Sequence, residues 1–139
     1  MTPMNRFVLR TDPELDPEYV IQAFGEDAYA LHPFSHGANY ETAAAFLENG
    51  AGAVAWYHRE IVSSASSFLT FHHEVELDVS TAEAHRRKGL AEACVSRMLR
   101  DCMQRGLTVH WDAQNESSRR LAEKFGFTVE QSYTVYVLV

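Results

Sequence analysis

One stretch of the chain restricts its fold more than any other: residues 90–105 carry apolar side chains at i, i+1, i+4 and i+5 in continuous repetition. That spacing predicts an amphipathic helix with one apolar stripe, and Gly106 ends it. Residues 74–79 alternate strictly between acidic and apolar side chains, and residues 107–111 are mostly apolar, so both are predicted strands. A strand–helix–strand unit of this kind makes a right-handed crossover between two parallel strands. The stripe consists of Leu90, Ala91, Cys94, Val95, Met98, Leu99, Cys102 and Met103.

Shorter patterns predict further strands and helices around this unit. Residues 51–57 and 61–71 form predicted strands joined by a turn, and the serines of the second suit a curved or bulged strand. Residues 19–24 place apolar side chains at helical spacing before Gly25 and are expected to form a helix. The sequence therefore predicts an α/β fold, a mixed central sheet with helices on both faces, in a single domain over residues 1–139. The other predicted elements are a strand over 6–10, a helix over 40–48, a helix from Asn115 to about 125, and strand again over 128–139.

Composition limits the classes of partner. The chain has 139 residues, with 19 acidic and 12 basic side chains, a net charge of −7 and a pI of about 5.4. A protein that binds nucleic acid presents a basic face, so this balance argues against such a partner. No apolar run approaches the roughly 18 residues of a membrane helix. Residues 1–10 lack an apolar signal core, and we expect a cytoplasmic protein without a membrane partner.

The segment that opens the long helix predicts a binding site for an anion. Residues 85–91 read His-Arg-Arg-Lys-Gly-Leu-Ala. The small residues Gly89 and Ala91 let backbone N–H groups approach a ligand closely, and the first turn of a helix supplies unpaired donors and a partial positive charge. Three adjacent basic side chains favour a small anionic ligand, most simply a pyrophosphate. A solvated charge run before an ordinary helix is the alternative interpretation of the same residues.

Two motifs resemble those of the GCN5-related N-acetyltransferase (GNAT) superfamily. Residues 86–91 fit its R/Q-x-x-G-x-G/A signature, and residues 115–127 resemble its N-x-x-S-x-x-L-x-x-K-x-G-F helix. The resemblance implies a GNAT fold, in which a splayed pair of parallel strands, here 74–79 and 107–111, binds acetyl-coenzyme A (acetyl-CoA). The residues that also resemble the zwittermicin-resistance-type branch of the superfamily are Thr81, Arg86, Gly89 to Ala91, Trp111, Asp112 and Ala122 to Phe127.

The resemblance also implies a reaction: direct transfer of the acetyl group of acetyl-CoA to a primary amine of a small molecule, without a metal. The pantetheine arm would pair like an extra strand with the backbone of Leu77 and Val79, and an N–H near Val79 would serve the thioester oxygen. Asn115 and Ser118 would reach the arm or the thioester end. The pyrophosphate would lie on the amides of Arg86, Arg87, Lys88, Gly89, Leu90 and Ala91.

A general base is needed because only a neutral amine attacks the thioester. Glu74, Glu76 and Asp78 lie on one face of the predicted strand over 74–79, where partial desolvation would raise the pKa of a carboxyl group. Glu76 is the first choice because it directly precedes the residues expected to pair with the cofactor, and Glu74 and Asp78 follow. A solvated strand face is the alternative interpretation of this row.

The general acid is the point at which the chain departs from the superfamily. Ala122 stands at the position where much of the superfamily has a Tyr that protonates the leaving thiolate, so Ser118, Tyr133 or water would take that role. The departure also favours an alternative function, a catalytically weak or inactive module that binds CoA or another protein. Residues 133–139 are too apolar for a free tail and predict a covered strand or an edge that pairs two copies as a homodimer.

Other reactive side chains are assigned to the core. The sequence has no C-x-x-C or H-E-x-x-H pattern, and a metal site is not expected. Cys94 and Cys102 belong to the apolar stripe and are expected to pack as small hydrophobic residues rather than act as nucleophiles. They lie eight residues apart, about 12 Å along a helix, which is too far for a disulfide. His110 lies beside Trp111 in a predicted core strand and is expected to be packed.

Overall fold

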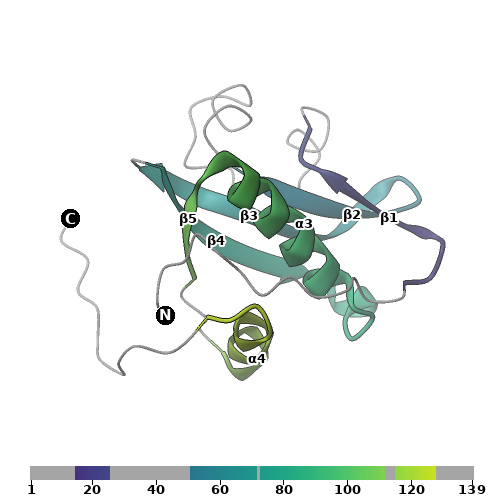
Figure 1. Cartoon of the computed structure of the whole chain (residues 1–139). Helices are drawn as coiled ribbons and strands as arrows, with labels where there is room; N and C mark the ends of the chain where they lie inside the picture. The colour runs from purple at the N-terminus through teal and green to yellow at the C-terminus, as the bar shows by residue number, and fades with distance from the viewer. Residues whose placement is uncertain (1–14, 26–50, 72, 112–114, 128–139) are drawn as a thin grey trace.

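The computed structural model describes residues 15–25, 51–71, 73–111 and 115–127, which build one five-stranded sheet and its helices (Figure 1). The strands lie in chain order across the sheet, β1-β2-β3-β4-β5. Neighbours from β1 to β4 are antiparallel, and β4 and β5 are parallel. The elements are β1 (Tyr19–Ala23), β2 (Gly52–Tyr57), β3 (Glu60–Phe71), β4 (Glu74–Thr81), the 3-10 helix η2 (Glu83–His85), α3 (Leu90–Arg105), β5 (Thr108–His110) and α4 (Glu116–Lys124).

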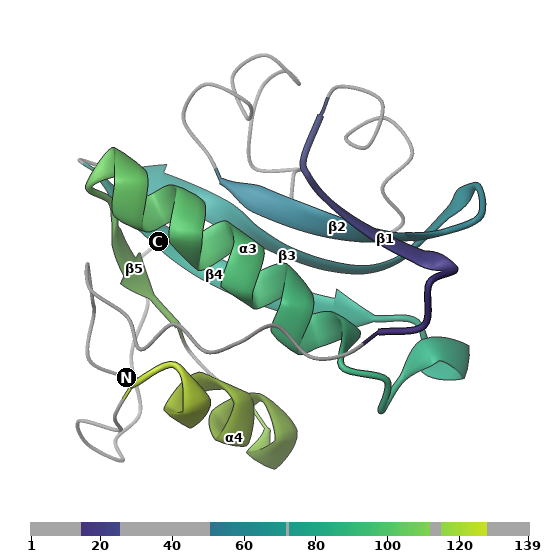
Figure 2. The ribbon, with the colours of Figure 1, turned by 45° about the vertical axis from the view of Figure 1, so that its right-hand side comes forward.

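The helix predicted from the apolar stripe is α3, and it connects the parallel strands β4 and β5. It runs across one face of the sheet and contacts every strand (Figure 2). Gly106 takes the left-handed conformation, with φ of 70°, and its N–H bonds the carbonyl of Met103. The predicted crossover and the mixed sheet are thereby confirmed. The helix predicted over 40–48 lies outside the described residues, as do the strands predicted over 6–10 and 128–139.

The helix predicted over residues 19–24 is wrong, because Tyr19–Ala23 form the edge strand β1. Its register with β2 runs from Tyr19 opposite Tyr57 to Ala23 opposite Ala53. Tyr19 and Ile21 pack against the core, whereas Val20 is 47% exposed. The apolar residues therefore fit the two-residue period of a strand as well as they fit the period of a helix. Pairing with β2 decides between the two periods, and a local pattern cannot reveal it.

The core lies between α3 and the sheet. Val75 and Leu77 of β4 point toward the helix and are almost fully buried. On β2 and β3 the facing positions hold small residues, which let the helix approach the strands closely. β3 is bulged between Ser67 and Leu69, as its serines predicted. The α3 residues buried against the sheet include Leu90, Cys94, Val95, Met98, Leu99 and Cys102.

Both cysteines are free, buried members of this core, as predicted. Burial raises the pKa of the Cys94 thiol to about 12, against a smaller lowering by a hydrogen bond from Ser63. Burial likewise raises the pKa of Cys102 to about 12. Because the thiolate is the nucleophilic form, neither group is reactive at neutral pH.

The second described helix, α4, is attached to the same core through the residues around it. The rings of Trp111 and Phe127 meet edge to face with centroids 5.6 Å apart, and Ala122 and Phe125 are fully buried. At the surface, Lys124 Nζ lies 3.9 Å from Glu92 Oε1 of α3. These contacts place α4 beside the N-terminal half of α3. Neither α3 nor α4 is long and apolar enough to cross a membrane.

Candidate functional site

The loop from β4 to α3 has the geometry of an anion site. Gly89, the N-cap residue of α3, is left-handed with φ of 81°, and no side chain caps the helix. Arg87 is also left-handed, with φ of 63°, which a non-glycine residue adopts at a cost of about 1–2 kcal/mol. The first helical bond runs from Ala93 N–H to the carbonyl of Gly89. Among the described residues, the amides of 87–92 have no backbone acceptor, so they are available to a ligand.

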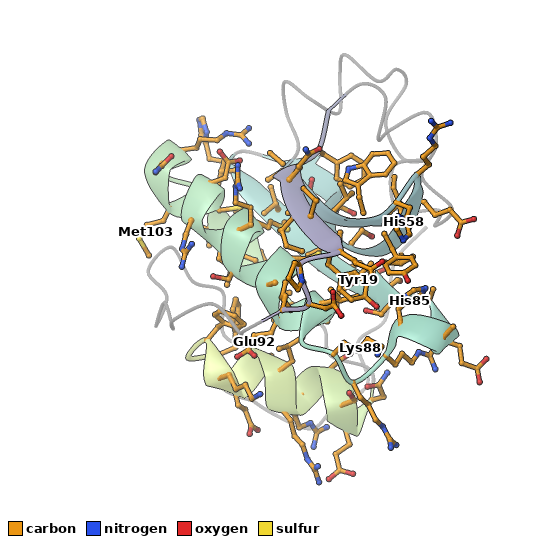
Figure 3. The ribbon with its side chains drawn as sticks, turned by 90° about the vertical axis from the view of Figure 1, so that its right-hand side faces the viewer. Tyr19, His58, His85, Lys88, Glu92 and Met103 are labelled. Atoms are coloured by element: carbon orange, nitrogen blue, oxygen red, sulfur yellow. The ribbon has the colours of Figure 1, made fainter. Side chains whose placement is uncertain are left out.

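The basic side chains of the loop differ in their contacts. Arg86 Nε donates to the carbonyl of Thr81 at 3.2 Å, which folds that side chain back along the end of β4. Arg87 and Lys88 are exposed, with no ion pair inside the described part of the chain. Figure 3 shows Lys88 and Glu92 on the side of the loop that faces α4. The loop therefore combines exposed positive charge with N–H groups that have no backbone acceptor among the described residues.

The parallel strands part after a short ladder. β4 pairs with β5 only from Glu74, opposite Thr108, to Glu76, opposite His110. β4 itself continues to Thr81, so from Leu77 onward its second edge has no strand partner within the described ranges. On that segment Val79 N–H donates to Asp78 Oδ1 at 2.9 Å. The predicted parallel pair is present, and the part of β4 that extends beyond the end of β5 includes both predicted cofactor-pairing residues, Leu77 and Val79.

The three acidic residues of β4 differ in their contacts. Glu74 Oε1 lies 2.8 Å from His110 Nε2, and Asp78 accepts the Val79 amide. Glu76, half-buried in the middle of the row, has no side-chain partner among the described residues. Glu76 is therefore the carboxylate of the row for which the described part of the chain provides no partner.

His110 corrects an expectation from the sequence. It was expected to pack in the core, but its side chain is 32% exposed and pairs with Glu74 on the face of the sheet away from α3. The register explains why: His110 stands opposite Glu76 and points to the same side as the acidic row. The sequence shows that Val109 and His110 point to opposite faces of the sheet. It does not show which of the two faces is buried against α3.

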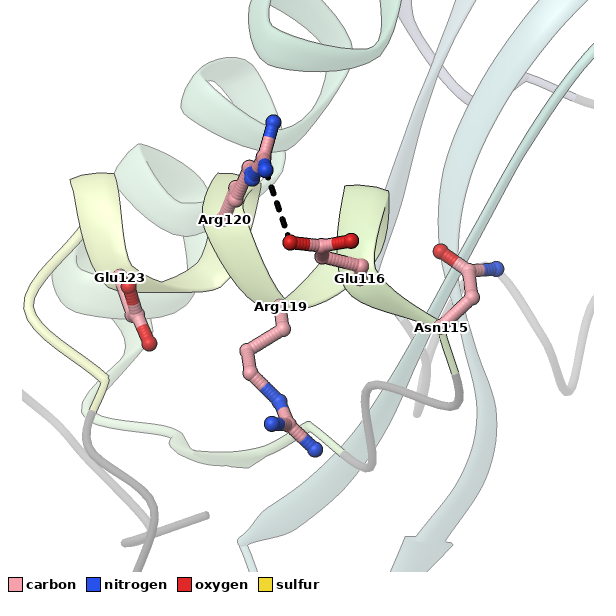
Figure 4. Close-up of a pocket in the computed structure, with 5 residues that line it drawn as sticks. All are labelled: Asn115, Glu116, Arg119, Arg120 and Glu123. Carbon is pink, nitrogen blue, oxygen red and sulfur yellow. Dashed lines mark hydrogen bonds and ion pairs between the residues drawn. The ribbon is translucent and has the colours of Figure 1, made fainter.

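The N-terminus of α4 holds the other predicted cofactor residues. Asn115 Oδ1 accepts the Ser118 N–H at 2.8 Å and caps the helix, as predicted. The Ser118 side chain is half-buried. A surface hollow of about 470 Å³ on the outer side of α4 shares only Asn115 with the predicted site, and a Glu116–Arg120 ion pair crosses it (Figure 4). The other residues that line this hollow are Arg119 and Glu123.

No group of His, Cys, Asp and Glu side chains in the described part of the chain has the arrangement of a metal site. Ala122, at the position of the superfamily's usual Tyr, is fully buried in the core. No phenol therefore reaches the site from this position of α4. Tyr133, the other predicted candidate for the acid, lies outside the described residues.

A model of the GNAT acetyltransferase family matches residues 6–136 of the chain. The chain belongs to the GNAT acetyltransferase family. Among curated proteins, the uncharacterized N-acetyltransferase YdfB of Bacillus subtilis (strain 168) is 30% identical to this GNAT chain over 129 residues. The match covers 88% of the chain and 49% of the relative, so the chain spans about half the relative's length.

Solved structures agree with the GNAT fold. The GNAT-like protein from Streptococcus suis 89/1591 is 28% identical, with a TM-score of 0.78 over 91% of this chain and 57% of the other. An aminoglycoside acetyltransferase, meta-AAC0020 from an uncultured soil sample, was solved with sisomicin and is 14% identical, with a TM-score of 0.63 over 91% and 99% of the two chains. At that identity the likeness concerns the fold alone. The predicted GNAT fold is confirmed, whereas the roles of individual residues remain predictions.

Proposed function

We propose that this GNAT protein moves the acetyl group of acetyl-CoA to a primary amine of a small molecule by direct attack. The observation that carries the proposal is the uncapped N-terminus of α3, which lies beside the edge where β4 leaves β5. Diphosphates bind well to backbone amides at such a helix start. The free edge of β4 offers an extended arm a row of backbone donors and acceptors. Acetyl-CoA is a molecule that carries both chemical parts.

In this proposal the donor lies across the loop and along β4. The pyrophosphate binds the amides of residues 86–91, assisted by the exposed charges of Arg87 and Lys88. The pantetheine arm pairs with Leu77 and Val79. The Val79 N–H is held by Asp78 Oδ1, so the donor displaces that carboxylate when it binds. Asn115 and Ser118 contact the arm from the start of α4.

The freed Val79 N–H then has a catalytic use. The amine nitrogen attacks the thioester carbon, and the negative charge that develops on the carbonyl oxygen is stabilised by this N–H. The C–S bond breaks, and the thiolate of CoA takes a proton from Ser118 or from water. The products are an N-acetyl amine and CoA thiol, which balances the reaction without a metal or a redox step.

Glu76 takes the proton of the attacking amine. The other two carboxylates of its row already have partners, His110 for Glu74 and the Val79 amide for Asp78, whereas Glu76 has none within the described ranges. The row as a whole favours a cationic acceptor over an anionic one. A sisomicin-bound relative shares the fold, which supports small amines as the acceptor class to test first.

The substitution Glu76→Gln tests the base. We expect the turnover number to fall about 100-fold and to rise more steeply with pH, because only amine that is already deprotonated in solution can react. CoA affinity is expected to stay unchanged. Initial rates of thiol release over a panel of amines, measured across pH, supply the readout.

Glu74→Gln on the same strand face is the matched control, and its turnover is expected to stay within about threefold of the wild type. A normal pH–rate profile for Glu76→Gln would contradict the assignment and move the role to Glu74, Asp78 or water.

A second candidate function is a module that binds CoA without turnover, favoured by the buried Ala122 in place of the usual Tyr. Thermal unfolding with acetyl-CoA and with CoA, followed by thiol release on the amine panel, separates the two functions. Stabilisation without release on any amine supports the module. Absence of any stabilisation would contradict both functions.

A further inference from the structure

From Glu83 to Lys88 the loop between β4 and α3 is exposed at every side chain but one. Glu83, Ala84, Arg86, Arg87 and Lys88 are all exposed, whereas His85 between them is partly buried. The side chain of His85 also contacts the first two strands of the sheet, β1 and β2. The loop is therefore anchored to the sheet through a residue that directly precedes the basic run.

The contacts of His85 are specific. Its Nδ1 lies 2.8 Å from the hydroxyl of Tyr19, at the start of β1. The imidazole meets the Tyr19 ring edge on, at 5.7 Å between centroids, and lies 4.9 Å from the Tyr57 ring of β2. In Figure 3, Tyr19, His58 and His85 gather on the side of the loop opposite Lys88 and α4. One hydrogen bond and two rings thus hold the imidazole.

The rings that receive His85 are themselves fixed. Tyr19 and Tyr57 are direct partners in the β1–β2 register, with ring centroids 5.1 Å apart. Glu18 Oε2 lies 2.9 Å from His58 Nε2, which ties the start of β1 to the β2–β3 turn. The nearby charge of Glu18 raises the pKa of Tyr57 above its ordinary value, at which the hydroxyl is already neutral at physiological pH. The pocket for His85 is therefore built by strands, not by the loop.

We propose that Tyr19 is a positioning residue for the phosphate-binding loop, acting through its hydrogen bond to His85. The inference rests on the proposed function, because it concerns the affinity of the same loop for CoA. Two residues beyond His85 the backbone turns left-handed at Arg87, a conformation that persists only where the surroundings hold it. The Tyr19–His85 hydrogen bond holds the loop from one side, and the start of α3 holds it from the other. Together they keep the amides of 87–92 directed at a ligand.

The substitution Tyr19→Phe removes the hydroxyl and keeps the ring. We expect the Kd for CoA to rise about fivefold, as for the loss of one ordinary hydrogen bond. The Kd for pantetheine, which lacks the pyrophosphate, is expected to stay unchanged. This split distinguishes loop positioning from general loss of structure, since a loosened fold would weaken both ligands. Isothermal calorimetry with each ligand, after a thermal unfolding check, measures it.

Three further substitutions make the test specific. In His85→Ala the Tyr19 hydroxyl has lost its partner, so adding Tyr19→Phe is expected to produce no additional loss of CoA affinity. His85→Asn keeps a short side chain that can accept the hydrogen bond and is expected to restore part of the affinity. Tyr57→Phe removes a hydroxyl from the neighbouring ring and is expected to leave CoA binding unchanged.

The outcomes separate this inference from the proposed function. Unchanged CoA affinity in Tyr19→Phe, equal losses for CoA and pantetheine, or an equal effect of Tyr57→Phe would overturn the role of Tyr19 while CoA binding by the wild type stood. A wild-type chain that binds no CoA would overturn the proposed function and this inference with it.

Discussion

The two described helices begin in opposite ways. α4 starts at Asn115, whose backbone is extended and whose side chain accepts the N–H of Ser118. α3 starts at Gly89, whose backbone is left-handed and which has no side chain to accept anything. Both helices leave the same end of the parallel strand pair. The difference shows that a side chain of the protein satisfies a first-turn amide at α4, whereas no side chain does so at α3.

The charges around the two starts differ as well. Glu116 in the first turn of α4 suits the positive end of that helix and pairs with Arg120 at 2.7 Å. α3 also has an acidic residue in its first turn, Glu92, but its start follows a basic run, which the positive end of a helix repels. Such an arrangement costs stability in the empty protein and is compensated when an anion binds.

The largest effect is expected from placing a negative side chain at the open helix start. Gly89→Glu should weaken CoA binding about 100-fold or more, because the carboxylate competes with the pyrophosphate for the same amides. Gly106→Glu at the other end of α3 is the matched control. It carries a similar backbone cost at φ of 70°, and nothing lies within 4 Å of an added Cβ.

Both variants are expected to lose similar stability, about 1–2 kcal/mol, and only Gly89→Glu is expected to lose CoA affinity. Calorimetric titration and thermal unfolding of the pair measure the two quantities. A folded Gly89→Glu protein with wild-type affinity would remove the phosphate site from the loop.

An intermediate effect is expected at the closed helix start. Asn115→Ala should lower the free energy of unfolding by about 1 kcal/mol, since the N–H of Ser118 loses its acceptor. Asn115→Asp keeps a capping oxygen and is expected to retain the wild-type stability. Denaturant unfolding of both variants measures the difference, and equal stability of Ala and Asp variants would show that the cap is not what stabilises α4.

The smallest effect is expected at Glu92, the acidic residue in the first turn of α3. Its ion pair with Lys124 is long, at 3.9 Å, and partly exposed, so Glu92→Gln should change stability by less than about 0.5 kcal/mol. CoA affinity should rise about twofold at low salt, because one negative charge is removed near the bound phosphates. The gain should vanish at high salt.

Glu123→Gln, on the exposed side of α4, is the control and is expected to change neither quantity. A twofold loss of affinity in Glu92→Gln would show that the carboxylate supports the loop rather than opposes the ligand.

The sequence predicted best where local patterns and tertiary packing agree. The bounds of α3 were predicted from its stripe and Gly106, and the cap of α4 from Asn115, because both signals lie within the helices they describe. Residues 19–23 were misassigned because their apolar positions fit two periods, and only the β2 partner selects one.

The site was predictable to the same degree. Glycine and basic residues in a row identified the loop, and the alternation in 74–79 identified the acidic face. The sequence could not show three contacts: the ion pair of His110 with Glu74, the hydrogen bond from the Val79 N–H to Asp78, and the hydrogen bond between His85 and Tyr19. The His110–Glu74 and His85–Tyr19 contacts join segments far apart in sequence, and no local pattern encodes the strand register and packing that create them. The Asp78–Val79 hydrogen bond joins adjacent residues, but the alternation of acidic and apolar residues does not specify how the carboxylate is oriented.

The short ladder between β4 and β5 has a mechanical consequence. Three residue pairs contribute few backbone hydrogen bonds, so β5 is retained chiefly by the burial of Val109 and of Trp111 just beyond it. The buried side chains of Val109 and Trp111 therefore attach β5 to the rest of the fold more than its backbone hydrogen bonds do.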